Sequence, residues 1–423
     1  MTRLTARADR RLVRPNHRSH RYVLVEVTAP GATTARERTP VNLAFVLDRS
    51  GSMSGGKLAL AKAAVGDALA RLDDRDRFSV IVYDDVVDVV VESTAATGEA
   101  KHNAMGRLAA IEPRGSTNLS DGWLRGCEQV ALHATESGVD RVLLLTDGLA
   151  NKGITDATTL AGHARELRTR GVVTSTFGVG TDFDEHLLQA MADAGGGHFY
   201  YIADAAAIRD HIASEVGETL EVTARDTSLE VLAGEGVEVE TISPHQVTSR
   251  GSRSIVTIGD LVADQVLEVV LRLTVPYGHL GQETGLIVAI NDRDGAFEAA
   301  RVGDARLTWT WADDAANDGQ PRDTDVDRAV ARQFTARAQQ EAVLLNRRGD
   351  YGGAQHVLSG TARRISGYAR GDASMLAMSA QLVMESREAA APMDPVMLKK
   401  MHFEGANMAR SRDVLGRSLK KPR

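Results

Sequence analysis

Hydroxyl and carboxylate side chains follow an apolar segment in the first part of the chain with a regular spacing. Asp48, Ser50 and Ser52 come directly after residues 41–47 in the pattern Asp-x-Ser-x-Ser. These side chains offer only oxygen atoms, which are the ligands of hard divalent cations such as Mg2+ rather than of zinc or copper. The spacing therefore predicts a metal site at the carboxyl end of a strand.

Two later segments supply the same kind of oxygen atom. Thr117 lies in the loop 114–118 before a predicted helix, and Asp147 ends the apolar run 143–146 and precedes Gly148. In a doubly wound sheet the carboxyl ends of the strands meet along one edge, where ligands bind. The predicted metal ligands are therefore Asp48, Ser50, Ser52, Thr117 and Asp147.

The elements that must position these residues alternate between short apolar runs and longer helical patterns. Strands are expected at 42–47, 78–83, 86–91, 142–146, 172–177 and 198–202, and helices at 57–72, 101–111, 120–134, 157–170, 184–194 and 205–216. This alternation predicts an α/β domain over residues 40–218, with a doubly wound, mostly parallel sheet. The segment 86–91 follows a tight Asp84-Asp85 turn, so we expect it to be an antiparallel edge strand.

The rest of the chain has other periodicities. Residues 219–311 alternate with period two, which indicates an antiparallel β-sandwich. Alternating segments within residues 1–39 are expected to complete that sandwich, so that the α/β domain is inserted in it. Downstream we expect three further parts, namely a linker at 312–324, a C-terminal α-helical region at 325–391 and a basic tail at 392–423.

The three-part oxygen pattern resembles the metal-ion-dependent adhesion site of the von Willebrand factor A (VWA) domain family. That family carries Asp-x-Ser-x-Ser, then a threonine in a loop, then an aspartate followed by glycine, and each of the five predicted ligands matches a position of this pattern. The resemblance covers about residues 40–218. The segments 177–180, 182–184 and 197–200 resemble, in this order, the last third of bacterial members of the family. In those members the domain is often inserted between sandwich strands.

The resemblance implies the function of the site. Ser50, Ser52 and usually Thr117 would bind Mg2+ or Mn2+ directly, while Asp48 and Asp147 would act largely through bound water. Neutral hydroxyls in the inner shell leave the ion electrophilic. The remaining coordination position would accept an Asp or Glu carboxylate from a partner protein.

Simpler or rival explanations apply to parts of the pattern. Serine and aspartate are common in turns and helix caps, so any one segment alone is unremarkable. The segment from Gly51 to Lys57 satisfies Gly-x-x-x-x-Gly-Lys, as a phosphate-binding P-loop does, but Leu58 stands where that loop needs a hydroxyl for Mg2+. Asp48 as a phosphoryl acceptor would need a second acid where the chain has Ser50.

The sequence shows an ion site without an activated nucleophile or general base beside it, so we predict a non-enzymatic, metal-dependent protein-binding module. Three alternatives stay open. The first is a metal-dependent hydrolase or phosphatase. The second is an accessory subunit of an ATPase complex whose ATPase is another chain. The third is a site that serves stability alone.

Composition limits the remaining possibilities. The 423 residues carry a net charge of -7, which argues against a general nucleic-acid-binding protein, although seven arginines and one acid occur in residues 1–21. We interpret that basic segment as an exposed strand edge. The single cysteine, Cys127, fits a reducing compartment. With neither a signal peptide nor an apolar stretch of about 18 residues, we expect a cytoplasmic location and no membrane span. Partner identity, oligomeric state and the choice between Mg2+ and Mn2+ cannot be predicted.

Overall fold

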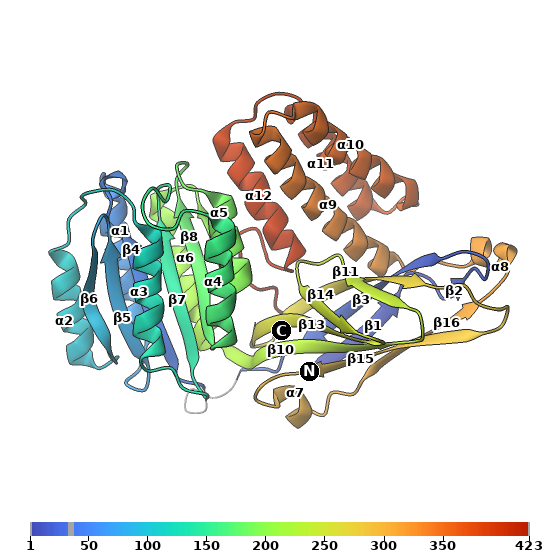
Figure 1. Ribbon diagram of the computed structural model, residues 1–423, viewed down its shortest axis with the longest axis horizontal. Coiled ribbons are helices and arrows are strands. Elements are labelled where there is room, and N and C mark those ends of the chain that lie inside the picture. The colour runs from blue at the N-terminus through green and yellow to red at the C-terminus, as the bar shows by residue number, and fades with distance from the viewer. Residues whose placement is uncertain (1, 33–37, 422–423) are drawn as a thin grey trace. The chain divides into compact units, whose positions relative to one another are not determined.

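The computed structural model describes residues 2–32 and 38–421, and these residues divide into two compact units (Figure 1). The first, which we call the α/β unit, holds Thr34–Val222 and Leu415–Arg417. The second, which we call the β/helical unit, holds Met1–Thr33, Thr223–Val414 and Ser418–Arg423. The predicted boundary at residue 39 and the end of the predicted basic tail adjoin residues 33–37 and 422–423, which lie outside the described residues.

The α/β unit is built on one six-stranded sheet with the order β6-β5-β4-β7-β8-β9. Its strands are β4 (Val41–Asp48), β5 (Arg77–Tyr83), β6 (Val87–Ala95), β7 (Val139–Thr146), β8 (Val172–Val179) and β9 (Gly196–Ile202). All neighbouring pairs are parallel except β5 and β6. The predicted antiparallel edge strand is therefore confirmed. Every residue of β4 and β7 is buried, as strands covered by helices on both faces must be.

Helices lie on both faces of this sheet (Figure 1). They are α1 (Lys57–Arg71), α2 (Gly98–Ala109), α3 (Leu119–Ala131), α4 (Ala157–Thr169), α5 (Glu185–Gly195) and α6 (Ile208–Leu220), with short 3-10 turns η1 (Gly51–Met53) and η2 (Ala205–Ala207). Asp184 accepts hydrogen bonds from the amides of His186 and Leu187 and so caps α5, where the sequence predicts a helix start. Cys127 on α3 is buried as a free thiol, and burial raises its pKa.

The β/helical unit contains two sheets that share one hydrophobic core. The first has the order β1-β3-β14-β11, and the second has the order β12-β13-β10-β15-β16-β2. Their bounds are β1 (Arg3–Ala8), β2 (Leu12–Val13), β3 (Ser19–Thr28), β10 (Val222–Ala233), β11 (Glu238–Thr241), β12 (Gln246–Arg250), β13 (Arg253–Val262), β14 (Val266–Val275), β15 (Glu283–Asn291) and β16 (Ala305–Trp311). Val25 of the first sheet packs in the same cluster as Val231 and Trp309 of the second.

The helices of this unit are α7 (Ala296–Ala299), α8 (Asp314–Gly319), α9 (Thr324–Arg347), α10 (Tyr351–Tyr368), α11 (Ala373–Glu388) and α12 (Pro395–Ala409). Ala342, Leu358, Leu382 and Leu398 come from α9 to α12 and share one core, which accounts for the C-terminal helical region. None of the helices within the described ranges is both long and apolar enough to cross a membrane.

Helices lie in the two segments that were expected to be a linker and a tail. The expected linker 312–324 contains α8, and Asn317 donates from Nδ2 to the Val13 carbonyl at 3.2 Å while Gln320 Oε1 accepts the Leu12 amide at 2.8 Å. These amide side chains hold the segment to β2. The expected tail contains α12, because Asp394 caps a helix that begins at Pro395, where the missing N–H of proline carries no penalty.

Candidate metal site

The five predicted ligands lie at the carboxyl ends of two central neighbouring strands and in one adjoining loop. Asp48 is the last residue of β4, and Asp147 directly follows β7. Because β4 and β7 are parallel, with Leu47 paired to Leu145, their following residues emerge at the same edge of the sheet. Thr117 immediately precedes Asn118, whose side chain caps α3.

Oxygen–oxygen contacts join three of these residues, Ser50, Ser52 and Asp147. The Ser50 and Ser52 hydroxyl oxygens are 3.0 Å apart, and the Ser52 hydroxyl donates to Asp147 Oδ1 at 2.6 Å. A Cβ placed on Gly148 would lie 3.5 Å from both Ser52 Oγ and Thr117 Oγ1. The structure thus brings Thr117 to the same place. Ser52 is exposed, whereas the other four residues are buried.

Asp48 is completely buried and accepts hydrogen bonds from neutral groups on both carboxylate oxygens. The Ser50 amide donates to Oδ1 at 2.8 Å, and the Thr146 hydroxyl donates to Oδ2 at 2.6 Å. Burial raises the pKa of Asp48 to about 6, against the opposing effect of the Thr146 and Ser50 hydrogen bonds. Thr146 was not predicted as part of the site, although a hydroxyl residue at the end of an otherwise apolar strand could have indicated it.

Lys57 is a further member of the site that the sequence did not assign to it. Its ammonium lies 2.6 Å from Asp147 Oδ2, and the Asp147 side chain is 0% exposed. A cation at the first position of a helix opposes the helix dipole, and α1 carries no acid in its first turn to offset it. The ion pair with Asp147 offsets this unfavourable position. In a P-loop the corresponding lysine binds phosphate instead.

Backbone hydrogen bonds fix the loop that carries Thr117. The Gly51 amide donates to the Gly115 carbonyl at 3.2 Å, which ties this loop to the turn after β4. Gly115 has a φ of +69°, a left-handed conformation that glycine adopts without strain. On the other side, the Thr117 amide donates to Asn151 Oδ1 at 3.0 Å. The hydroxyl of Thr117 is thus positioned from both sides.

The donor chemistry fits a hard divalent cation. All five side chains offer oxygen, two carboxylates balance a double positive charge, and the hydroxyls are the neutral ligands that Mg2+ or Mn2+ accepts together with water. Cysteine and histidine are not among these five residues. This arrangement can hold such an ion beside Ser52, an exposed residue, where a group from outside can reach the ion.

Comparison with known proteins gives matches both to the part of the chain that carries this site and to the chain more widely. Residues 42–214 match the family model of the von Willebrand factor type A domain. The chain is similar to the uncharacterized protein YfbK of Escherichia coli (strain K12), with 29% identity over 192 residues, 45% of this chain and 33% of that protein. It is also similar to the uncharacterized protein sll0103 of Synechocystis sp., with 29% identity over 267 residues, 60% of this chain and 62% of that protein.

The matched regions therefore span less than two thirds of either relative. Among solved structures, the von Willebrand factor type A protein from Catenulispora acidiphila is similar over 96% of both chains, with a TM-score of 0.73 and 18% identity. At that identity the likeness shows a shared fold along nearly the whole chain.

Proposed function

We propose that this chain, whose residues 42–214 form a von Willebrand factor type A domain, binds a partner protein through a divalent cation. Such domains bind divalent metal ions and typically mediate protein–protein interaction without catalysing a reaction. The cation would be Mg2+ or Mn2+, held by Asp48, Ser50, Ser52, Thr117 and Asp147. An Asp or Glu carboxylate of the partner would occupy the remaining coordination position.

One observation carries this proposal. Ser52 is exposed while its hydroxyl contacts both the buried Ser50 hydroxyl and the buried Asp147 carboxylate. An ion bound among these oxygens is therefore shielded on the protein side and open on the solvent side. Mg2+ keeps part of its water shell and exchanges water for carboxylate, which suits a partner's acidic side chain. Direct binding by the hydroxyls, with Asp48 and Asp147 acting through water, would leave the ion electrophilic.

A metal-dependent hydrolase or phosphatase is the second candidate. The pKa of Asp48, raised to about 6, favours it because a group that titrates near neutrality suits acid–base chemistry. Against it, both Asp48 oxygens already accept hydrogen bonds within the fold. Turnover of phosphate or peptide substrates that stops in Asp48→Asn would establish the hydrolase. A role as an accessory subunit would instead require an ATPase chain among the bound partners.

We also infer that the two sheets of the β/helical unit form a sandwich into which the α/β unit is inserted. The shared core of the sheets supports this arrangement, as does the chain order, in which β3 and β10 flank the α/β unit. An insertion of this kind attaches the metal-binding domain to its host at both ends. Deletion of the α/β unit with a short joining linker should then leave the β/helical unit folded.

The decisive experiment is affinity capture of partners from the native cell, with Mg2+ and with EDTA. We expect a specific partner to be retained with Mg2+ and released by EDTA, and to be lost from Ser50→Ala and Asp48→Ala proteins that remain folded. Ser54→Ala is the matched control, because Ser54 is exposed and lies two residues beyond Ser52. Full retention of the partner in EDTA would contradict the metal-mediated interaction.

A further inference from the structure

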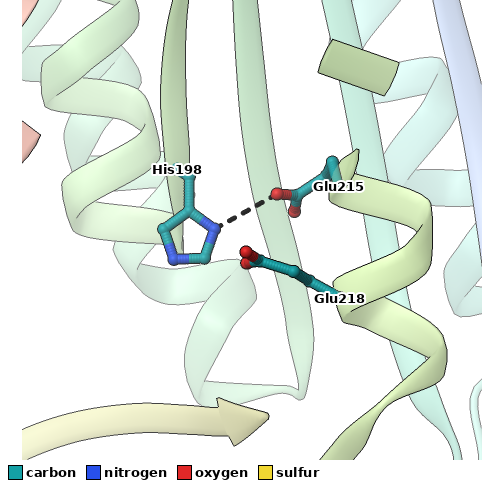
Figure 2. A group of neighbouring side chains, drawn as sticks. All are labelled: His198, Glu215 and Glu218. Carbon is teal, nitrogen blue, oxygen red and sulfur yellow. Dashed lines mark hydrogen bonds and ion pairs between the residues drawn. The ribbon is translucent and has the colours of Figure 1, made fainter. Parts of the chain in front are cut away.

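A second group of metal-ligating side chains lies in the α/β unit, formed by His198, Glu215 and Glu218 (Figure 2). His198 comes from β9, and both glutamates come from α6. Residues three apart on a helix share a face, so both carboxylates can approach the same imidazole. One ligand atom from each residue lies within 4.8 Å of the other two. We propose that these three side chains bind a zinc ion.

This group is separate from the site at Asp48. Glu215 contacts Arg141, and Arg141 pairs with Leu43 in the neighbouring strand β4. Leu43 precedes Asp48 by five residues of extended strand, which is roughly 16 Å. The group therefore lies toward the amino ends of the strands, whereas the first site lies at their carboxyl ends. The two sites share no ligand.

The donor set differs from that of the first site in a way that changes the preferred metal. An imidazole nitrogen with two carboxylate oxygens suits Zn2+ better than Mg2+, which favours oxygen alone. His198 Nδ1 lies 3.2 Å from Glu215 Oε2. Two ligands of a tetrahedral zinc ion, each about 2.0–2.1 Å from the metal, are about 3.3 Å apart. The spacing of this nitrogen and oxygen is therefore compatible with a shared ion.

Surrounding residues hold the Glu215 carboxylate in place. Its Oε1 accepts hydrogen bonds from Arg141 Nη1 at 2.7 Å and from the Ser175 hydroxyl at 2.6 Å, and its Oε2 accepts the Tyr200 hydroxyl at 2.6 Å. Carboxylates that bind metals are commonly oriented by such hydrogen bonds. Arg141 and Ser175 bond the oxygen that does not contact His198. The other oxygen, Oε2, accepts the Tyr200 hydroxyl and also lies beside the imidazole.

Burial and charge favour a bound cation. Glu215 is 0% exposed and Glu218 is buried, and two buried carboxylates close together repel each other when both are ionised. Arg141 contacts Glu215, and a zinc ion between the two carboxylates would reduce their repulsion. The His198 side chain is 21% exposed, so the ion would enter from that side. Three protein ligands would leave one coordination position for water.

The test uses the full chain with Asp48→Ala, which removes the first site, so its outcome does not depend on the proposed function. After treatment with EDTA and its removal, the protein is titrated with Zn2+ by isothermal titration calorimetry. We expect one zinc ion per chain, and at least tenfold weaker binding in His198→Ala and in Glu218→Gln. His102→Ala is the matched control, since His102 is exposed on α2.

Cobalt gives an independent spectroscopic measurement. Co2+ in place of zinc should produce visible absorption bands of a low-coordinate nitrogen–oxygen site, and Glu218→Gln should remove them. This isosteric change preserves packing, and thermal unfolding would verify that the variant is folded. Zinc affinity that is equal in the parent, His198→Ala, Glu218→Gln and His102→Ala proteins would overturn the proposal, as would absence of zinc binding. His198 and Glu215 would then form only a direct hydrogen bond.

Discussion

Asp48 and Glu215 are both completely buried carboxylates of the α/β unit, but different groups surround them. Asp48 accepts hydrogen bonds from an amide and a hydroxyl, both neutral. Glu215 accepts hydrogen bonds from a hydroxyl on each oxygen and from the Arg141 guanidinium. Neutral donors satisfy the lone pairs of a carboxylate and offset part of the cost of removing its charge from water, and a nearby positive charge offsets more of that cost.

The difference separates two uses of a buried acid. At Glu215 a fixed cation of the chain itself stabilises the ionised form. At Asp48 burial raises the pKa to about 6, so the ionised form would be stabilised by a cation from outside the chain. A divalent cation supplies that stabilisation in our proposal. Each of the following predictions tests one side of this comparison.

The largest effect on stability is expected when Glu215 loses the guanidinium of Arg141. Arg141→Met should reduce the free energy of unfolding by about 3–5 kcal/mol, because an uncompensated charge stays buried. Urea unfolding with EDTA present measures this loss. The double variant Arg141→Met/Glu215→Gln should recover a large part of it. Equal stabilities of the single and double variants would show that the charge of Glu215 does not require Arg141.

The second prediction concerns pH in metal-free protein. The folded pKa of Asp48 is raised above its ordinary value of 3.8, so the fold binds this proton more tightly than the unfolded chain does. Its contribution to stability is full below pH 3.8 and is lost as the pH rises through about 6, a change of about 3 kcal/mol. Urea unfolding of wild type and Asp48→Asn in EDTA between pH 4 and 7 measures it, and parallel pH profiles would disprove it.

The third prediction concerns the addition of a divalent cation to the site at Asp48. At a free metal concentration 100 times the dissociation constant, Mg2+ or Mn2+ should raise the free energy of unfolding by about 2.7 kcal/mol. Ser50→Ala should abolish this gain while leaving stability in EDTA nearly unchanged, and Ser54→Ala should keep it. Chemical unfolding with and without Mn2+ provides the measurement. An equal gain in wild type and Ser50→Ala would place the ion elsewhere.

The smallest effect concerns Lys57, whose ammonium competes with the ion for Asp147. Lys57→Met should tighten Mn2+ binding about fivefold, because a partly exposed ion pair is worth about 1 kcal/mol. Lys57→Arg, which keeps the charge, should bind Mn2+ like wild type. Electron paramagnetic resonance of free Mn2+ during titration gives both affinities. Weaker binding in Lys57→Met would mean that Lys57 helps to hold the site together.

The convergence of the five oxygen-bearing residues can be predicted from the amino-acid sequence because the information is local. Asp-x-Ser-x-Ser follows an apolar strand directly, and Thr-Asp-Gly ends another, so parallel pairing alone brings Asp48 and Asp147 together. The pairing of Lys57 with Asp147 spans 90 residues and depends on the path of the loop between β4 and α1. No spacing rule encodes that path. The group at His198 is hidden for the same reason.

The fold shows a similar division between local and distant information. Apolar runs and caps predict the strands and helices of the α/β unit, including the helix start at Asp184. Strand β12 has mostly exposed residues and lacks a clear alternation, so only its pairing with β13 defines it. Helix α8 is short and polar, and the contacts of Asn317 and Gln320 with β2 hold it in place.

Cys127 offers a consequence of a different kind. Thiol reagents react with the thiolate, and this sole cysteine is buried on α3 with its pKa raised. The rate at which such a reagent modifies the native chain therefore reports how often α3 unfolds locally and exposes the thiol. Helix α3 begins directly after the loop of Thr117, so an ion bound at Thr117 should stabilise the helix against local unfolding. Slower modification of Cys127 in the presence of Mn2+ would measure that stabilisation without any engineered label.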